Sequence, residues 1–257
     1  MKKYAVITGA SSGIGAEFAK QLSHDYHLIL VARRKERLEA LAKQLKTPCE
    51  IIIADLSREE ECYQLFDKIK IYPIDLFINN AGFGDCDSFF HSHLDKETQM
   101  IHVNITALHI LTKLVLKHMQ ERDSGYLLNV ASSAGLTPGG PYMATYYATK
   151  SYVTSLTRAI AQELKEQHSH IYLGCLCPGP VDTEFNDIAQ VEFALKGISA
   201  SSCVQYCLKK MFQRQIVIIP TLKMKIALTL GKWIPTSLYI KIISHQQKKK
   251  IQKRISL

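Results

Sequence analysis

The sequence predicts an α/β fold: a single domain built on a doubly wound parallel sheet of about seven strands, with helices on both faces. Short apolar runs alternate with amphipathic stretches as far as residue 220, a pattern typical of parallel strands joined by crossover helices. A length of 257 residues with 47% apolar composition suffices for one domain with a sizeable core. The predicted strands lie near 4–8, 27–32, 50–54, 75–79, 125–131, 171–176 and 216–219.

The first strand leads directly into a glycine-rich turn, Gly9-Ala10-Ser11-Ser12-Gly13-Ile14-Gly15, and an amphipathic stretch follows. Glycine suits a tight turn that a pyrophosphate must approach closely. The free amides at the start of the following helix can then bind the phosphates. The order strand, turn, helix favours a dinucleotide site over a glycine-rich turn without a ligand.

The second strand ends at Arg33-Arg34, and no acidic residue occupies positions 32–35. A carboxylate here would bind the ribose 2′-hydroxyl of NAD and repel a 2′-phosphate, whereas arginine matches phosphate oxygens. The sequence therefore favours NADP(H), with NAD(H) as the alternative. Arg33 is the candidate for the 2′-phosphate and Arg34 for stacking on the adenine. The other interpretation is that both are solvated charges at the start of the next helix.

A tyrosine and a lysine four residues apart, Tyr146 and Lys150, come fourteen residues after Ser132. On a helix they share one face, roughly 6 Å apart along the axis. A nearby ammonium would lower the pKa of the phenol from about 10, and a serine hydroxyl could hold a substrate oxygen. This trio predicts proton transfer to or from an alcohol or carbonyl. The alternative is a surface helix with one tyrosine turned inward.

Together these motifs resemble the short-chain dehydrogenase/reductase family from residue 4 to about residue 220, which implies a Rossmann-type fold. The further motifs, in family order, are Asp55-Leu56, Asn79-Asn80-Ala81-Gly82, Asn104, Asn129-Val130-Ala131-Ser132-Ser133 and Pro178-Gly179-Pro180-Val181-Asp182-Thr183. The resemblance implies that the cofactor contacts Gly9, Ser11, Ser12, Gly13, Ile14, Gly15, Arg33, Arg34, Asp55, Leu56, Asn80, Ala81, Gly82, Tyr146, Lys150, Pro178, Gly179, Val181 and Thr183.

The resemblance also implies the catalytic roles. Tyr146 would exchange a proton with the substrate oxygen, which Ser132 would hold. Lys150 would lower the pKa of the phenol and bind the nicotinamide ribose, and Asn104 would anchor a water that links Lys150 to solvent. Ser132 is preferred to its neighbour Ser133 because the family's serine lies three residues after the asparagine of this strand. Tyr146, not Tyr147, lies four residues before a lysine.

Cysteine and histidine positions give no sign of a metal site. The seven cysteines leave at least one unpaired, and no spacing resembles a structural zinc site. With no signal peptide, these cysteines fit a reducing cytoplasm.

The C-terminal quarter holds the excess positive charge. Residues 193–257 contain 13 Lys and Arg and no acid, while residues 1–192 contain 19 basic and 23 acidic residues, a net charge of −4. We expect a catalytic domain over 1–220, with a substrate lid at 184–215, and a basic amphipathic helical extension over 221–257. The extension suits an anionic membrane surface. Its alternative is packing on the substrate mouth or a neighbouring subunit. Nucleic acid binding is not expected, because no nucleic-acid-binding module is present.

The predicted function is an NADP(H)-dependent oxidoreductase. It would transfer hydride between the nicotinamide and an apolar ketone, aldehyde or secondary alcohol. The alternative is a catalytically inactive dinucleotide sensor or scaffold of the same fold. We expect a homo-oligomer, a dimer or tetramer, in the cytoplasm and peripheral at the membrane.

Overall fold

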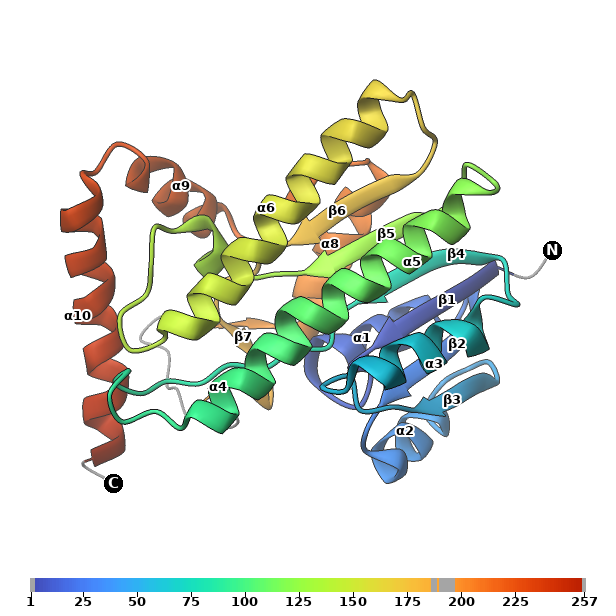
Figure 1. Cartoon of the computed structure of the whole chain (residues 1–257), viewed down its shortest axis with the longest axis horizontal. Coiled ribbons are helices and arrows are strands. Elements are labelled where there is room, and N and C mark those ends of the chain that lie inside the picture. The colour runs from blue at the N-terminus through green and yellow to red at the C-terminus, as the bar shows by residue number, and fades with distance from the viewer. Residues whose placement is uncertain (1–2, 186–188, 190–196, 256–257) are drawn as a thin grey trace.

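The computed structural model describes the backbone of residues 3–185, 189 and 197–255, with side chains as far as residue 248. Seven parallel strands form its main sheet, in the order β3-β2-β1-β4-β5-β6-β9 (Figure 1). They are β1 Lys3–Thr8, β2 Tyr26–Ala32, β3 Cys49–Ile53, β4 Ile74–Asn79, β5 Tyr126–Val130, β6 Tyr172–Leu176 and β9 Val217–Ile218. The short strands β7 (Val181–Asp182) and β8 (Ile198–Ser199) pair separately. The predicted parallel sheet of about seven strands is confirmed.

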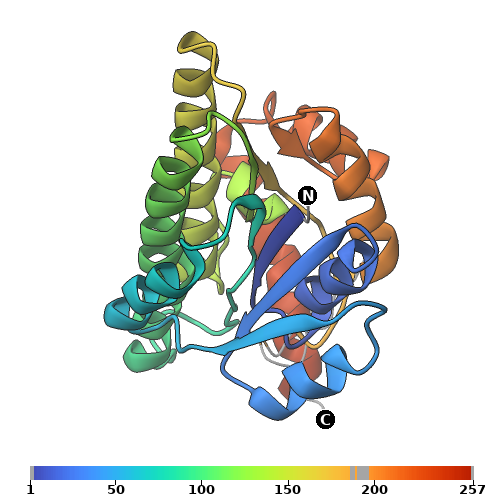
Figure 2. The same ribbon diagram turned by 90° about the vertical axis from the view of Figure 1, so that its right-hand side faces the viewer.

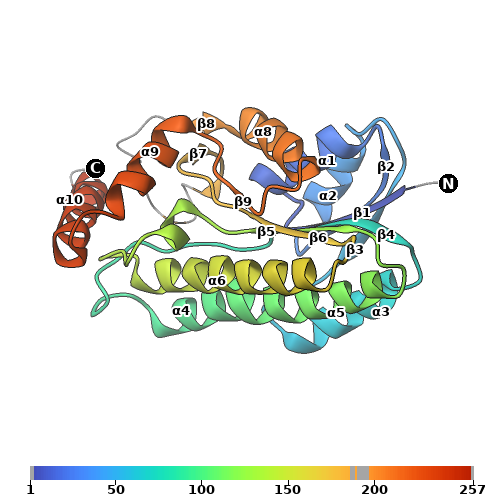
Figure 3. The ribbon, with the colours of Figure 1, turned by 90° about the horizontal axis from the view of Figure 1, so that it is seen from above.

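Helices cover both faces of the sheet (Figures 2 and 3). On one side lie α1 Gly13–Leu22, α2 Lys35–Ala42 and α8 Ala200–Phe212. On the other lie α3 Glu59–Ile69, α4 Leu94–Ile101, a π-helical segment His102–Ala107, α5 Leu108–Gln120 and α6 Ala144–Glu166. The central strands are mainly apolar because helices bury them from both sides, and residues 28–32 of β2 are all buried.

The strand order reverses between β1 and β4, which places a crevice at the carboxyl ends of these strands. The glycine-rich turn after β1, the Asn79–Gly82 segment after β4 and Ser132 after β5 all meet at this edge. The fold therefore assembles the predicted motifs along one side of the sheet.

Part of the segment expected to be a lid belongs to the core. Within 184–215, the helix α8 buries Cys203, Val204, Cys207 and Met211 in the cluster that also contains Phe18 of α1. Residues 186–188 and 190–196 of the expected lid lie outside the described residues. Of the described residues of this segment, Phe185 lines the cavity described below.

The C-terminal extension forms two helices, α9 Leu222–Gly231 and α10 Thr236–Ile255. Both lie beyond the carboxyl ends of the strands, at the opposite end of the molecule from the N-terminus (Figure 3). In α10, Ile243 and Gln247 are buried, so this helix packs on the body of the protein.

One described helical stretch, Leu94–Gln120, is long and apolar enough to cross a membrane. This is weak evidence for a span, because the core helices of soluble proteins pass the same test. Leu111, Val115 and Met119 of this stretch are fully buried against the sheet, as in a core helix.

Candidate active site

A cavity of about 470 Å³ opens at the carboxyl edge of the sheet. Nearly all of the predicted site residues line it. Those that do are Gly9, Ser11, Ser12, Gly13, Ile14, Arg33, Arg34, Asp55, Leu56, Asn80, Ala81, Gly82, Ser132, Tyr146, Lys150, Pro178, Gly179, Val181 and Thr183. The two others lie behind its wall: Gly15 packs closely against Gly9 and Asn80, and Asn104 hydrogen-bonds the backbone of Phe83.

The glycine-rich turn has the geometry of a phosphate cradle. Gly9 and Gly13 have φ of +64° and +54°, a region that favours glycine. The side chain of Asn80 fastens the turn to β4, because its Nδ2 donates to the carbonyl oxygens of Thr8 at 2.9 Å and Gly9 at 3.2 Å. No side chain caps the start of α1, so its first amides are free to bind an anion. These residues fit a dinucleotide pyrophosphate.

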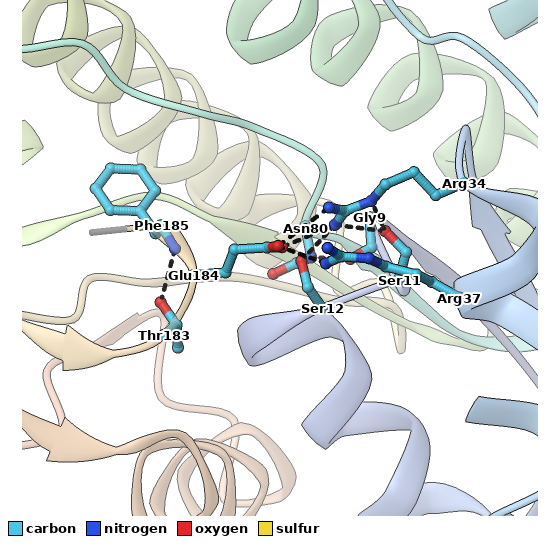
Figure 4. Close-up of polar contacts among 9 residues, drawn as sticks. All are labelled: Gly9, Ser11, Ser12, Arg34, Arg37, Asn80, Thr183, Glu184 and Phe185. Carbon is cyan, nitrogen blue, oxygen red and sulfur yellow. Dashed lines mark hydrogen bonds and ion pairs between the residues drawn. The ribbon is translucent and has the colours of Figure 1, made fainter. Parts of the chain in front are cut away.

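The adenosine end of the cavity carries the two predicted arginines, which behave differently. Arg33 has a half-exposed guanidinium 3.9 Å from Asp55. Arg34 turns toward the glycine-rich turn, and its Nη2 donates to Ser11 Oγ at 3.1 Å and Ser12 Oγ at 2.9 Å (Figure 4). It also pairs with Glu184, 2.9 Å away, an interaction that the sequence did not suggest.

The four predicted catalytic residues come together from three elements. Tyr146 and Lys150 lie one turn apart on α6, and both are buried. The Lys150 Nζ lies 5.9 Å from the centre of the Tyr146 ring and donates to the Val130 carbonyl oxygen at 3.0 Å. Ser132 lies just past the end of β5 and lines the same cavity as Tyr146. Ser133 and Tyr147 line the cavity as well, so the choice of Ser132 and Tyr146 stays a prediction.

Asn104 occupies the π-helical segment before α5, a type of helical irregularity that is frequent at functional sites. Its Oδ1 accepts from the Phe83 amide at 3.0 Å, and its Nδ2 donates to the Phe83 carbonyl oxygen at 2.9 Å and to Thr149 Oγ1 at 3.1 Å. The Thr149 hydroxyl in turn donates to the Tyr146 carbonyl oxygen. Asn104 therefore joins the loop after β4 to the turn of α6 that carries the Tyr–Lys pair.

Burial governs the protonation of the Tyr–Lys pair. Low polarity around a buried group disfavours its charged form. Burial therefore raises the pKa of Tyr146, which the hydrogen bond from Ser132 partly offsets. Burial also lowers the pKa of Lys150 from 10.5 to about 8. In this surrounding of protein groups, the Tyr146 phenol is thus protonated and can donate a hydrogen bond. Lys150 was expected to lower the pKa of this phenol, but burial has the larger effect on it.

The substrate end of the cavity contains residues that the sequence did not single out. Phe83, Met143 and Phe185 form apolar walls around Tyr146. The extension contributes Gln247, whose Nε2 donates to the Tyr147 hydroxyl at 2.6 Å. The Gln247 Oε1 is buried and has no hydrogen-bond partner within the part of the chain that the structure describes. Helix α10 therefore closes one side of the substrate end, and one polar atom there is unsatisfied.

This combination of parallel sheet, phosphate cradle and Tyr–Lys–Ser cluster is found in a known class of enzymes. A family model described as short chain dehydrogenase matches residues 3–191. The chain belongs to the short-chain dehydrogenase/reductase family of oxidoreductases, which use nicotinamide cofactors.

Among curated relatives, the chain is 36% identical to dehydrogenase/reductase SDR family member 11 of Bos taurus over 194 residues, covering 71% of this chain and 76% of that protein. It is 32% identical to 17-beta-hydroxysteroid dehydrogenase type 3 of Mus musculus, covering 71% of this chain and 61% of that protein.

A solved short-chain dehydrogenase from Sphingobium yanoikuyae, in complex with NADPH, matches with a TM-score of 0.80 and 29% identity, over 90% of this chain and 94% of that one. A Burkholderia phymatum member in complex with NAD shares the fold, with a TM-score of 0.81 and 22% identity, over 89% of this chain and 92% of that one. The neighbours thus bind both forms of the cofactor, and preference must be argued from this chain's own residues.

Proposed function

We propose that the protein is an NADP(H)-dependent oxidoreductase that interconverts an apolar ketone or aldehyde and the corresponding alcohol. The observation that carries this proposal is the meeting of Ser132, Tyr146 and Lys150 in the same cavity as the glycine-rich turn. A bound nicotinamide would supply or accept the hydride, while the protein supplies position and proton transfer.

Tyr146 is the acid of the reduction direction. Its protonated phenol donates to the carbonyl oxygen while Ser132 holds that oxygen in reach, and a positioned acid of this kind contributes roughly 10²–10⁴-fold. Lys150 binds the nicotinamide ribose, and its ammonium stabilises the phenolate as the proton leaves. Asn104 holds the backbone around Phe83 so that a water can connect Lys150 with solvent.

The NADP(H) preference rests on the adenosine end. Arg33 and Arg34 supply positive charge where the ribose 2′-position would lie, and Ser11 supplies a hydroxyl beside them. The contacts of Arg34 support it as a phosphate ligand in addition to Arg33, the candidate from the sequence. Replacing each arginine by alanine should weaken NADPH binding more than NADH binding. An equal loss for both cofactors would reject the preference.

A carbonyl panel followed by NADPH absorbance tests the activity. The panel contains aliphatic, aromatic and polycyclic ketones and aldehydes, because Phe83, Met143 and Phe185 favour apolar substrates. We expect turnover of bulky apolar carbonyls. An inactive sensor of the same fold would bind NADPH and reduce none of them.

We further propose that the extension over 221–257, appended to a catalytic domain over 1–220, docks the enzyme on an anionic membrane surface. Leu222, Ile226 and Leu230 repeat every four residues along α9 and are 71%, 50% and 61% exposed. Trp233 follows and is 86% exposed. Lysines flank this stripe, and residues 193–257 contain no acid. Exposed apolar residues among lysines suit an anionic lipid interface.

Flotation with anionic liposomes at low salt tests the docking. The full chain should float, and Leu230→Ser should reduce the bound fraction. Ile71→Ser is the matched control, because Ile71 is 72% exposed but lies in the turn between α3 and β4, at the amino ends of the strands. A chain that stays with the soluble fraction would reject the docking and leave the catalytic proposal intact.

The proposed setting is the cytoplasm, since within the described ranges Cys49, Cys62, Cys175, Cys177, Cys203 and Cys207 form no disulfide with one another, and a reducing compartment preserves that state. We propose a homo-oligomer, to be measured by light scattering.

A further inference from the structure

Glu184 lies among basic residues at the adenosine end of the cavity. It follows the short strand β7, far in the sequence from these basic residues. Its Oε2 accepts from Arg34 Nη2 at 2.9 Å, its Oε1 accepts from Arg34 Nη1 at 3.3 Å, and Arg37 on α2 donates to the same Oε1 (Figure 4). The two arginines, together with a hydrogen bond from Ser12, hold the pKa of this carboxyl well below its usual range, at about 2. Glu184 is therefore an anion at every pH at which the enzyme would work.

The guanidinium of Arg34 has little donor capacity left. An arginine offers five N–H donors in a fixed fork. Two point to the carboxylate of Glu184, and Nε and Nη2 also donate to the hydroxyls of Ser11 and Ser12. One N–H of Nη1 has no partner among the described residues, so Arg34 can bind a further anion through a pair of donors only if one of its present partners leaves.

We propose that Glu184 is a specificity-determining residue whose carboxylate occupies the site of the 2′-phosphate of NADP(H), so that cofactor binding exchanges one anion for the other. The inference rests on the proposed NADP(H) preference. A phosphate monoester carries a charge of about −1.5 to −2 at neutral pH and accepts through three oxygens. It needs the same arginine and serine donors, and it would be repelled by a carboxylate left among them.

NADH presents a ribose hydroxyl at this position instead of a phosphate. A hydroxyl does not require the guanidinium forks, so NADH can bind without moving Glu184. The carboxylate thus weakens the binding of NADPH but not that of NADH. It therefore reduces the preference for NADPH over NADH that Arg34 would otherwise give. Arg37, on α2, becomes a further ligand for the phosphate beside Arg33 and Arg34.

Glu184→Gln tests the exchange because it keeps the shape and removes the charge. NADPH and NADH dissociation constants are measured on the full chain by cofactor fluorescence. Partly exposed ion pairs contribute little each, so releasing the two should tighten NADPH binding about three- to tenfold. NADH affinity should be unchanged. Adenosine 2′-monophosphate, titrated by calorimetry, should tighten by a similar factor, since it presents the phosphate without the nicotinamide.

Glu39→Gln is the matched control. Glu39 is also a carboxylate of this region, but it pairs with Lys35 at 3.7 Å on α2, so this variant should bind both cofactors as the wild type does. Weaker NADPH binding by Glu184→Gln would overturn the inference, because Glu184 would then act as a clamp over the cofactor. An equal change for NADPH and NADH, or none, would overturn it as well. A wild type that binds NADH as tightly as NADPH would instead reject the proposed preference.

Discussion

Replacing Gly15 by alanine perturbs the phosphate cradle at its most tightly packed point. Gly15 lies in the first turn of α1 and packs against the turn after β1. A Cβ on this residue would lie 2.6 Å from Asn80 Nδ2 and 2.9 Å from the Gly9 carbonyl carbon, and closer still to the carbonyl oxygen of Gly9. Two of these atoms are backbone, so the turn itself must shift.

The expected cost combines two opposing effects. Alanine is favoured over glycine in a helix by roughly 0.5–1 kcal/mol, while overpacking that moves backbone costs about 1–3 kcal/mol or more. The net destabilisation should be about 2 kcal/mol, which lowers Tm by roughly 4–8 °C in a domain of this size. Because Asn80 holds the same turn, NADPH affinity should fall at least about tenfold, the equivalent of 1.4 kcal/mol.

Thermal unfolding and NADPH fluorescence titration measure both effects. Gly139→Ala is the control, because the nearest atom to its Cβ would be Ile240 Cδ1 at 4.0 Å, an ordinary contact. That variant should match the wild type in Tm and NADPH binding. A Gly15→Ala protein that is as stable as Gly139→Ala and binds NADPH equally well would refute the packing of the turn.

Three further predictions follow from the site. Asn104→Ala should lower the free energy of unfolding, measured in urea, by about 2–4 kcal/mol. The buried Asn104 side chain makes three hydrogen bonds, and without it polar groups of Phe83 are left unpaired. A decrease of less than about 1 kcal/mol would argue against these three hydrogen bonds. Burial lowers the pKa of Lys150 from 10.5 to about 8, so the unfolded chain holds this proton more tightly than the folded protein does. The free energy of unfolding of the wild type, relative to that of Lys150→Met, should therefore rise between about pH 8 and 10.5. A difference between the two proteins that stays constant across this pH range would contradict the prediction. Gln247→Leu should change the free energy of unfolding by less than about 1 kcal/mol, because it removes one hydrogen bond to Tyr147 and also one unsatisfied Oε1. The KM for the carbonyl substrate should change, and the affinity for NADPH should not. An altered NADPH affinity would mean that α10 acts on the cofactor site.

The sequence predicted best those features that depend on residues close to one another in the chain. Strands β1 to β6 and β9 were predicted from apolar runs, since burial on both sides leaves an unbroken apolar segment. The glycine-rich turn and the Tyr146–Lys150 pair depend on spacings of a few residues, and the structure brings them to one cavity.

Contacts between distant segments were not predictable in this way. Gln247 reaches Tyr147 across 100 residues because of how α10 lies on the body, and nothing in its local sequence encodes that direction. Glu184 meets Arg34 across 150 residues. Helix α8 falls inside the expected lid segment, yet its apolar face completes the core beside α1. A segment of mixed apolar and polar composition can lie either in a lid over the substrate or in the core, so its composition did not distinguish the two.

The proposed function requires Tyr146 to move the proton in a hydride-transfer reaction. This role is measured by single-turnover oxidation of bound NADPH by a ketone that the wild type reduces, comparing wild type with Tyr146→Phe, alongside NADPH affinity by fluorescence. Tyr146→Phe should bind NADPH within about twofold of the wild type and lose about 10²–10⁴-fold in the hydride-transfer rate. A variant that binds NADPH normally and transfers hydride at the wild-type rate would contradict it.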